Sequence, residues 1–166
     1  MGLSVDDIVA KFPTKTIPTI SGEPDYASIS SMVQLMYGNA ASLPTSLGGG
    51  QHGHVGLIMT PILYATLSDT NYESPEDPGN DIIAPAGRAA DREHQRHAHK
   101  EERRIFENHQ NMDDALKAQA IDTIDDTYLN ELQNKYTGNL GVSTRNLFDH
   151  LLDQYGKITP ANIEDS

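Results

Sequence analysis

Seven histidines and no cysteine define the metal chemistry that this 166-residue chain could carry. His94 and His97 lie three residues apart, which places them on one face of a helix, and Glu101 follows four residues later. Two imidazoles and a carboxylate on one helical face form a set that Zn²⁺ accepts. The surrounding sequence is polar on nearly every helical face, and no HExxH pattern occurs. We therefore interpret these side chains as solvated and predict no metal site.

A second pair of histidines follows three consecutive glycines, in the sequence GGGQHGH at 48–54. Glycine-rich loops can bind phosphate, but this one lacks the lysine and the Ser or Thr of a P-loop, and no βαβ pattern surrounds it. We interpret it as a tight, buried loop in which glycines permit close backbone approach and a histidine bonds a backbone carbonyl. A hydrolase or lyase that uses His52 or His54 is the catalytic alternative, and no other feature of the sequence supports it.

Other catalytic arrangements find no support in the sequence. There is no cysteine nucleophile and no GxSxG elbow. Three acidic pairs fall at predicted helix starts, where carboxylates favour the helix dipole; these pairs are Asp6-Asp7, Asp113-Asp114 and Asp125-Asp126. The spacing of Asp77 and Asp81 does not match a calcium-binding EF-hand loop. We predict no catalytic residue, no cofactor, no small-molecule substrate and no enzymatic activity.

The charge of the chain is segregated. The formal net charge is −12, yet residues 88–104 contain six of the twelve Lys and Arg residues against four acids, which gives +2 there and −14 elsewhere. The basic residues are Arg88, Arg92, Arg96, Lys100, Arg103 and Arg104. A basic helical face can bind nucleic acid or an acidic surface of another subunit, whereas the interleaved acids also allow ion pairs within the helix. No aromatic residues are interleaved for base stacking, so we favour charge complementarity between subunits.

The periodicity of apolar residues predicts an all-α fold, a compact bundle of five or six helices with a proline-rich N-terminal arm. Predicted helices begin after Ser4, span about 25–38, begin at Thr60-Pro61, span about 88–110, follow Asn111 to 124, begin at 126 or 127 and end at 138, and span 144–155 after Ser143. We expect Ala98, Ile105 and Phe106 to contact the core from the long polar helix. Residues 39–50 and 68–87 are predicted loops, the second anchored by Ile82 and Ile83.

The predicted organisation has three parts. Residues 1–24 form a short helix and an extended arm, residues 25–158 form the helical domain, and residues 159–166 begin a linker or helix that is cut off at Thr159-Pro160. No apolar run reaches the about 18 residues of a membrane span, and the first residues do not resemble a secretory signal. We therefore predict a cytoplasmic protein that does not bind membranes.

One stretch of the sequence resembles a known family. Residues 42–61 (SLPTSLGGGQHGHVGLIMTP) are similar to the Gag polyprotein of copia-type LTR retrotransposons, especially the algal branch. The resemblance covers about residues 25–166. It continues through Tyr64-Ala65-Thr66, the Pro78-Gly79 loop, the helix from Arg92 to Phe106, Tyr128-Leu129 and the segment from Leu147 to Pro160.

This resemblance implies the N-terminal half of a capsid protein, which in that family precedes a second helical domain and often a zinc knuckle. The implied function is structural: self-assembly into virus-like particles that package RNA through parts of Gag absent here. It implies the chain itself as partner and carries over no catalytic residue. The glycine-rich loop and the N-terminal arm are candidate contacts between subunits. The alternative is a domesticated nucleic-acid- or protein-binding module that uses the basic helix 88–104.

Overall fold

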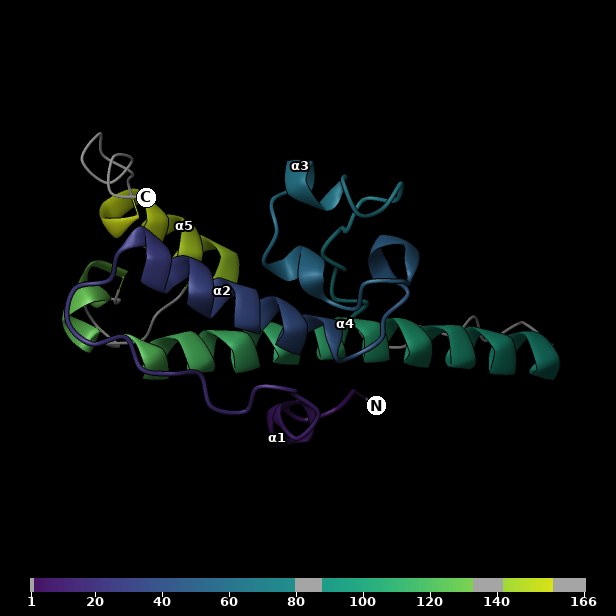
Figure 1. Cartoon of the computed structure of the whole chain (residues 1–166). Coiled ribbons are helices and arrows are strands. Elements are labelled where there is room, and N and C mark those ends of the chain that lie inside the picture. Colours follow the sequence, from purple (N-terminus) through teal and green to yellow (C-terminus); the bar gives the residue numbers. More distant parts are fainter. Residues whose placement is uncertain (1, 80–87, 133–141, 157–166) are drawn as a thin grey trace.

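The core of the molecule lies between the three longest helices, α2 (Tyr26–Ala41), α4 (Ala89–Thr123) and α5 (Thr144–Tyr155), and the N-terminal segment packs along one side of them (Figure 1). The structure, a computed structural model, describes residues 2–79, 88–132 and 142–156. These residues also form α1 (Val5–Val9) and α3 (Pro61–Tyr64). Short 3-10 turns are η1 (Leu47–Gly49), η2 (Val55–Leu57), η3 (Asp126–Tyr128) and η4 (Asn130–Leu132). No strand occurs in this part of the chain, and the predicted all-α fold is confirmed.

Side-chain caps fix where several helices begin. The hydroxyl groups of Ser4, Thr60 and Ser143 each accept a hydrogen bond from the backbone N–H three residues later, as their positions predicted. Asp25 and Ser28 form a reciprocal capping box at the start of α2. These bonds satisfy backbone donors that have no partner inside the helix.

Helix α4 is one continuous helix, so the predicted break at Asn111 is wrong. The side chain of Asn111 does not cap a helix; its amide donates to the carbonyl of Leu3, 2.7 Å away. Asp113 and Asp114 consequently lie inside α4 and not at a helix start. The asparagine is used for a contact with a segment over a hundred residues away, and local sequence gives no sign of that contact.

The two halves of α4 have different surroundings. The C-terminal half buries Met112, Leu116 and Ala120 against the core, whereas the N-terminal half runs beyond α2 and α5 into solvent (Figure 1). Ala98, predicted to contact the core, is exposed, and Ile105 and Phe106 are only half-buried. A helix of 35 residues is longer than the bundle it packs against, so its first turns have no apolar surface to cover.

Helices α2 and α5 supply most of the remaining core. The large apolar side chains that these two helices bury are Ile29, Met32, Met36, Leu147, Phe148 and Leu151. Helix α2 extends three residues beyond the predicted end at Gly38, which places Asn39 in the helix and not in a loop. Tyr26, the first residue of α2, is exposed.

The N-terminal arm is packed against its own domain. Ile17 is buried in the core, and the N–H of Ile20 donates to the carbonyl of Thr123 at 2.9 Å. Thr14 is held more firmly, because its N–H donates to Asn39 Oδ1 at 3.0 Å and its carbonyl accepts from Asn39 Nδ2 at 2.9 Å. Gln119 of α4 also donates to the Thr14 carbonyl. The arm is therefore engaged within the chain.

The predicted helix from 126 to 138 is wrong where the structure describes it. Two 3-10 turns occupy residues 126–128 and 130–132, and Leu129 between them is buried. Residues 133–141, like Ile82-Ile83 and Thr159-Pro160, lie outside the described residues. None of the described helices is both long and apolar enough to cross a membrane.

Candidate interaction surfaces

The glycine-rich loop contacts α3 and fixes its position. Gly48 has a φ of 62°, which side-chain-bearing residues rarely adopt, and its carbonyl accepts a 2.6 Å hydrogen bond from the hydroxyl of Tyr64. A Cβ at position 48 would lie 2.2 Å from that hydroxyl oxygen. Glycine is therefore required here. The buried Tyr64 side chain fixes α3 on the loop.

Tyr64 is the buried side chain of α3, and the apolar side chains near it in the sequence lie on the exposed side. Ile62 is 86% exposed, Leu63 44% and Leu67 43%. Single exposed apolar side chains are common on protein surfaces, but here three large ones fall within six residues of the chain. We call Ile62, Leu63 and Leu67 the α3 patch. The Tyr64–Gly48 bond beside it and its exposure make it a candidate contact surface.

The two loop histidines bond backbone carbonyls, as the tight-loop interpretation predicted. The Nε2–H of His52 donates to the Leu67 carbonyl at 3.0 Å, and the Nδ1–H of His54 donates to the Leu43 carbonyl at 2.9 Å. His54 is completely buried, and this burial lowers its pKa to about 4. Both rings thus fix the loop, and His54 has no exposed surface with which to meet a substrate.

The basic face of α4 is partly neutralised within the helix. Arg96 pairs with Glu93 at 2.6 Å, and Arg104 pairs with Glu101, so the ion pairs of the alternative interpretation form at these positions. No residue in the described part of the chain forms an ion pair with Arg88, Arg92 or Lys100. We call Arg88, Arg92, Arg96 and Lys100 the basic stripe.

The histidines of the same helix do not assemble into a metal site in the described residues. His94 and His97 are exposed. Within ranges 2–79, 88–132 and 142–156, no three His, Cys, Asp or Glu side chains are placed to share a metal ion.

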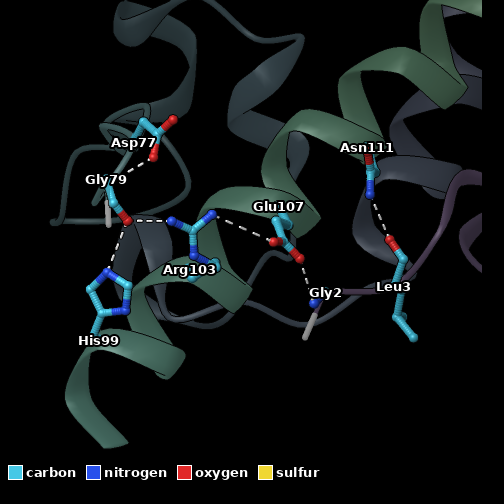
Figure 2. Close-up of polar contacts among 8 residues, drawn as sticks. All are labelled: Gly2, Leu3, Asp77, Gly79, His99, Arg103, Glu107 and Asn111. Carbon is cyan, nitrogen blue, oxygen red and sulfur yellow. Dashed lines mark hydrogen bonds and ion pairs between the residues drawn. The ribbon is translucent and has the colours of Figure 1, made fainter. Parts of the chain in front are cut away.

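A polar clasp marks the point where α4 leaves the body of the domain (Figure 2). The guanidinium of Arg103 donates to the Gly79 carbonyl and lies 3.9 Å from the carboxylate of Glu107. His99 Nε2–H donates to the same carbonyl at 3.0 Å. Glu107 also accepts from the backbone N–H of Gly2 at 2.9 Å. The clasp therefore joins the N-terminal segment and the loop before residue 80 to the middle of α4.

A polar cleft of about 400 Å³ lies between α4, α5 and the loop that contains Tyr72. Its lining is formed by Gly56, Leu57, Tyr72, Ser74, His109, Gln110, Asp113, Asp114, Ser143, Arg145, Asn146 and Asp149. No residue of this cleft was predicted as a binding residue, because the four segments that line it are separated in the sequence.

Tyr72 and His109 close one wall of this cleft. The Tyr72 hydroxyl lies 2.8 Å from His109 Nδ1, and the two rings stack with centroids 5.8 Å apart. Burial raises the pKa of Tyr72 and lowers that of His109, so both are neutral at pH 7. Tyr72 thus anchors a loop whose predicted anchors lie outside the described residues.

The cleft carries net negative charge. Asp113, Asp114 and Asp149 contribute three carboxylates against the guanidinium of Arg145, which gives −2 with His109 neutral. Asp113 also accepts from the backbone N–H of Thr144 at 3.0 Å, which fixes the start of α5 on α4. Asp114 and Asp149 are exposed. We call this hollow the acidic cleft.

These surfaces define an all-α domain with an exposed apolar patch, a basic helix and an acidic cleft. Comparisons of the chain with protein families, with curated proteins and with solved structures found no match. The function is therefore inferred from the residues and their geometry.

Proposed function

We propose that this chain is a structural, self-associating helical domain without enzymatic activity. The α3 patch is the observation that carries the proposal. A capped turn, Pro61 at its first position and the Tyr64–Gly48 bond hold three large apolar side chains in water. Covering apolar surface is worth about 25 cal/mol per Å², so such a patch favours association. The arm and the glycine-rich loop, which the sequence suggested as subunit contacts, instead bond within the chain, so the α3 patch is the surface we assign to association.

In its finer form the proposal is a capsid domain of the copia-type Gag kind, which assembles in the cytoplasm into particles around RNA. The resemblance of residues 42–61 to that family supports it. The same residues build the base of α3, since Gly48 accepts from Tyr64 and His54 holds Leu43. The residues that carry the resemblance are therefore also the residues that hold the proposed contact surface in place.

The proposal predicts that Ile62→Asp weakens self-association. Placing a carboxylate in the α3 patch removes an isoleucine worth about 1.5–3 kcal/mol on full burial and adds a charge to be desolvated. We expect the dissociation constant of the oligomer to rise about tenfold or more. Sedimentation equilibrium over a wide concentration range measures this, with circular dichroism to confirm the fold.

Leu35→Asp is the matched control, because Leu35 is an exposed apolar side chain on α2, away from α3. It should leave the oligomer mass unchanged. A wild-type chain that stays monomeric at every concentration would refute self-association, and equal losses in both variants would refute the assignment to α3.

A further inference from the structure

The first part of α4, residues 89–98, projects from the rest of the described chain. From Ala89 to Ala98 every side chain is exposed except that of Arg92, which is half-buried. Helices that are polar on all sides depend on pairs between their own side chains or bridge to another body. Exposed pairs such as Glu93–Arg96 stabilise a helix by only about 0.2–0.5 kcal/mol each. Packing within the described chain therefore does not account for this long basic extension.

The acidic cleft has the opposite charge and the size of a side-chain site. Its net charge is −2, and the carboxylates of Asp114 and Asp149 have no ion-pair partner among the described residues. A volume of about 400 Å³ admits one or two long basic side chains. The basic stripe offers Arg92 and Lys100, which lack acidic partners within the same residues.

The stripe cannot enter the cleft of its own chain. Lys100 and Asp114 belong to the same straight helix, fourteen residues apart, which corresponds to about 21 Å along the helix axis. No lysine side chain spans that distance. Within residues 2–79, 88–132 and 142–156, the stripe therefore cannot fill the cleft of its own chain, and a second copy can supply both partners.

We propose that the basic stripe of one copy docks into the acidic cleft of a second copy. This inference rests on the self-association proposed above and assigns it a second contact, separate from the α3 patch. Because stripe and cleft are different surfaces, the contact is heterologous: it adds copies head to tail, closing into a ring or extending as a filament. A chain of net charge −12 supplies acidic surface of its own and repels a phosphate backbone, which favours this occupant over nucleic acid.

Complementary charge reversal tests the contact in the full chain. The stripe variant is Arg92→Glu with Lys100→Glu, and the cleft variant is Asp114→Lys with Asp149→Lys. Each alone brings like charges together and should weaken assembly about tenfold or more at low salt. An equimolar mixture of the two should regain the wild-type mass distribution, because each reversed surface now meets a reversed partner. Sedimentation velocity at about 20 mM and about 0.5 M NaCl reports the masses, with loss of the contact at high salt.

Lys11→Glu with Lys15→Glu is the matched control, since it makes the same change in net charge on exposed residues of the N-terminal segment. Wild-type assembly of this control with rescue in the mixture supports the proposal. Wild-type assembly of both charge variants, with Ile62→Asp still defective, overturns this contact and leaves the proposed function intact. No assembly of the wild-type chain overturns both. Loss without rescue, together with a salt-sensitive affinity for a 20-nucleotide RNA that the stripe variant lacks, overturns it in favour of nucleic-acid binding.

Discussion

Asn39→Ala should lower the free energy of unfolding by about 3 kcal/mol, because it removes the amide that ties the N-terminal arm to α2 and α4. The side chain is completely buried. It exchanges two hydrogen bonds with the backbone of Thr14 and donates a third, of 2.8 Å, to Gln119 Oε1. Truncation leaves the Thr14 N–H and the Gln119 oxygen without these partners. Urea denaturation followed by circular dichroism measures the change as a lower midpoint at similar slope.

The matched control for this substitution is Gln34→Ala, on the exposed face of the same helix. It should change the stability by less than about 0.5 kcal/mol. The double variant with Gln119→Ala tests the network further, because the two amides share Thr14 as a partner. Additive losses from Asn39→Ala and Gln119→Ala would contradict a coupled network.

Local signals in the sequence predicted the caps, the fold class and much of the core. Ser4, Thr60 and Ser143 begin their helices as predicted, because a cap involves residues only three positions apart. The apolar face of residues 112–124 and that of α5 also lie in the core. Periodicity succeeds there because one buried face repeats every turn.

The sequence did not predict the features that depend on distant contacts. The Asn39–Thr14 bonds, the Asn111–Leu3 bond and the Tyr72–His109 pair join segments 25 to 108 residues apart. Nothing in local composition distinguishes an asparagine that caps a helix from one that bonds a distant carbonyl. The same limit explains why α4 was divided at Asn111.

Of the three candidate surfaces, one was predicted from the sequence and two were missed. The basic stripe was found from charge spacing alone, since its members lie on one helix. The acidic cleft was missed, because Asp114 and Asp149 come from different helices and meet only after folding. The α3 patch was also missed: Ile62, Leu63 and Tyr64 look alike in the sequence, and the hydroxyl bond of Tyr64 to Gly48 decides which of them is buried.

His54 is the second site at which one side chain should control stability, here through pH. Its Nδ1–H donates to the Leu43 carbonyl, and its Nε2 atom is buried with no hydrogen-bond partner in the described residues. Protonation would add a charge and an N–H donor that has no acceptor. Burial is the main cause that lowers the pKa to about 4, with His109 adding to it and the Leu43 bond opposing it.

Stability should therefore fall by about 3 kcal/mol as the pH decreases from 6.5 to 4, through this residue alone. Well above pH 6.5 the ring is neutral in both states and contributes no pH dependence. Below pH 6.5 the unfolded chain binds a proton that the folded chain does not bind until about pH 4.

The variant His54→Asn tests this. It keeps a donor for the Leu43 carbonyl and removes the titrating ring, so the loss of stability over this range should shrink although the variant is less stable throughout. Part of the slope should remain, because burial also lowers the pKa of His109. His94→Asn, at an exposed position of α4, is the control for removing a histidine elsewhere. Urea midpoints measured between pH 7 and 4 that decline equally in wild type and His54→Asn would show that the buried ring is not the group responsible.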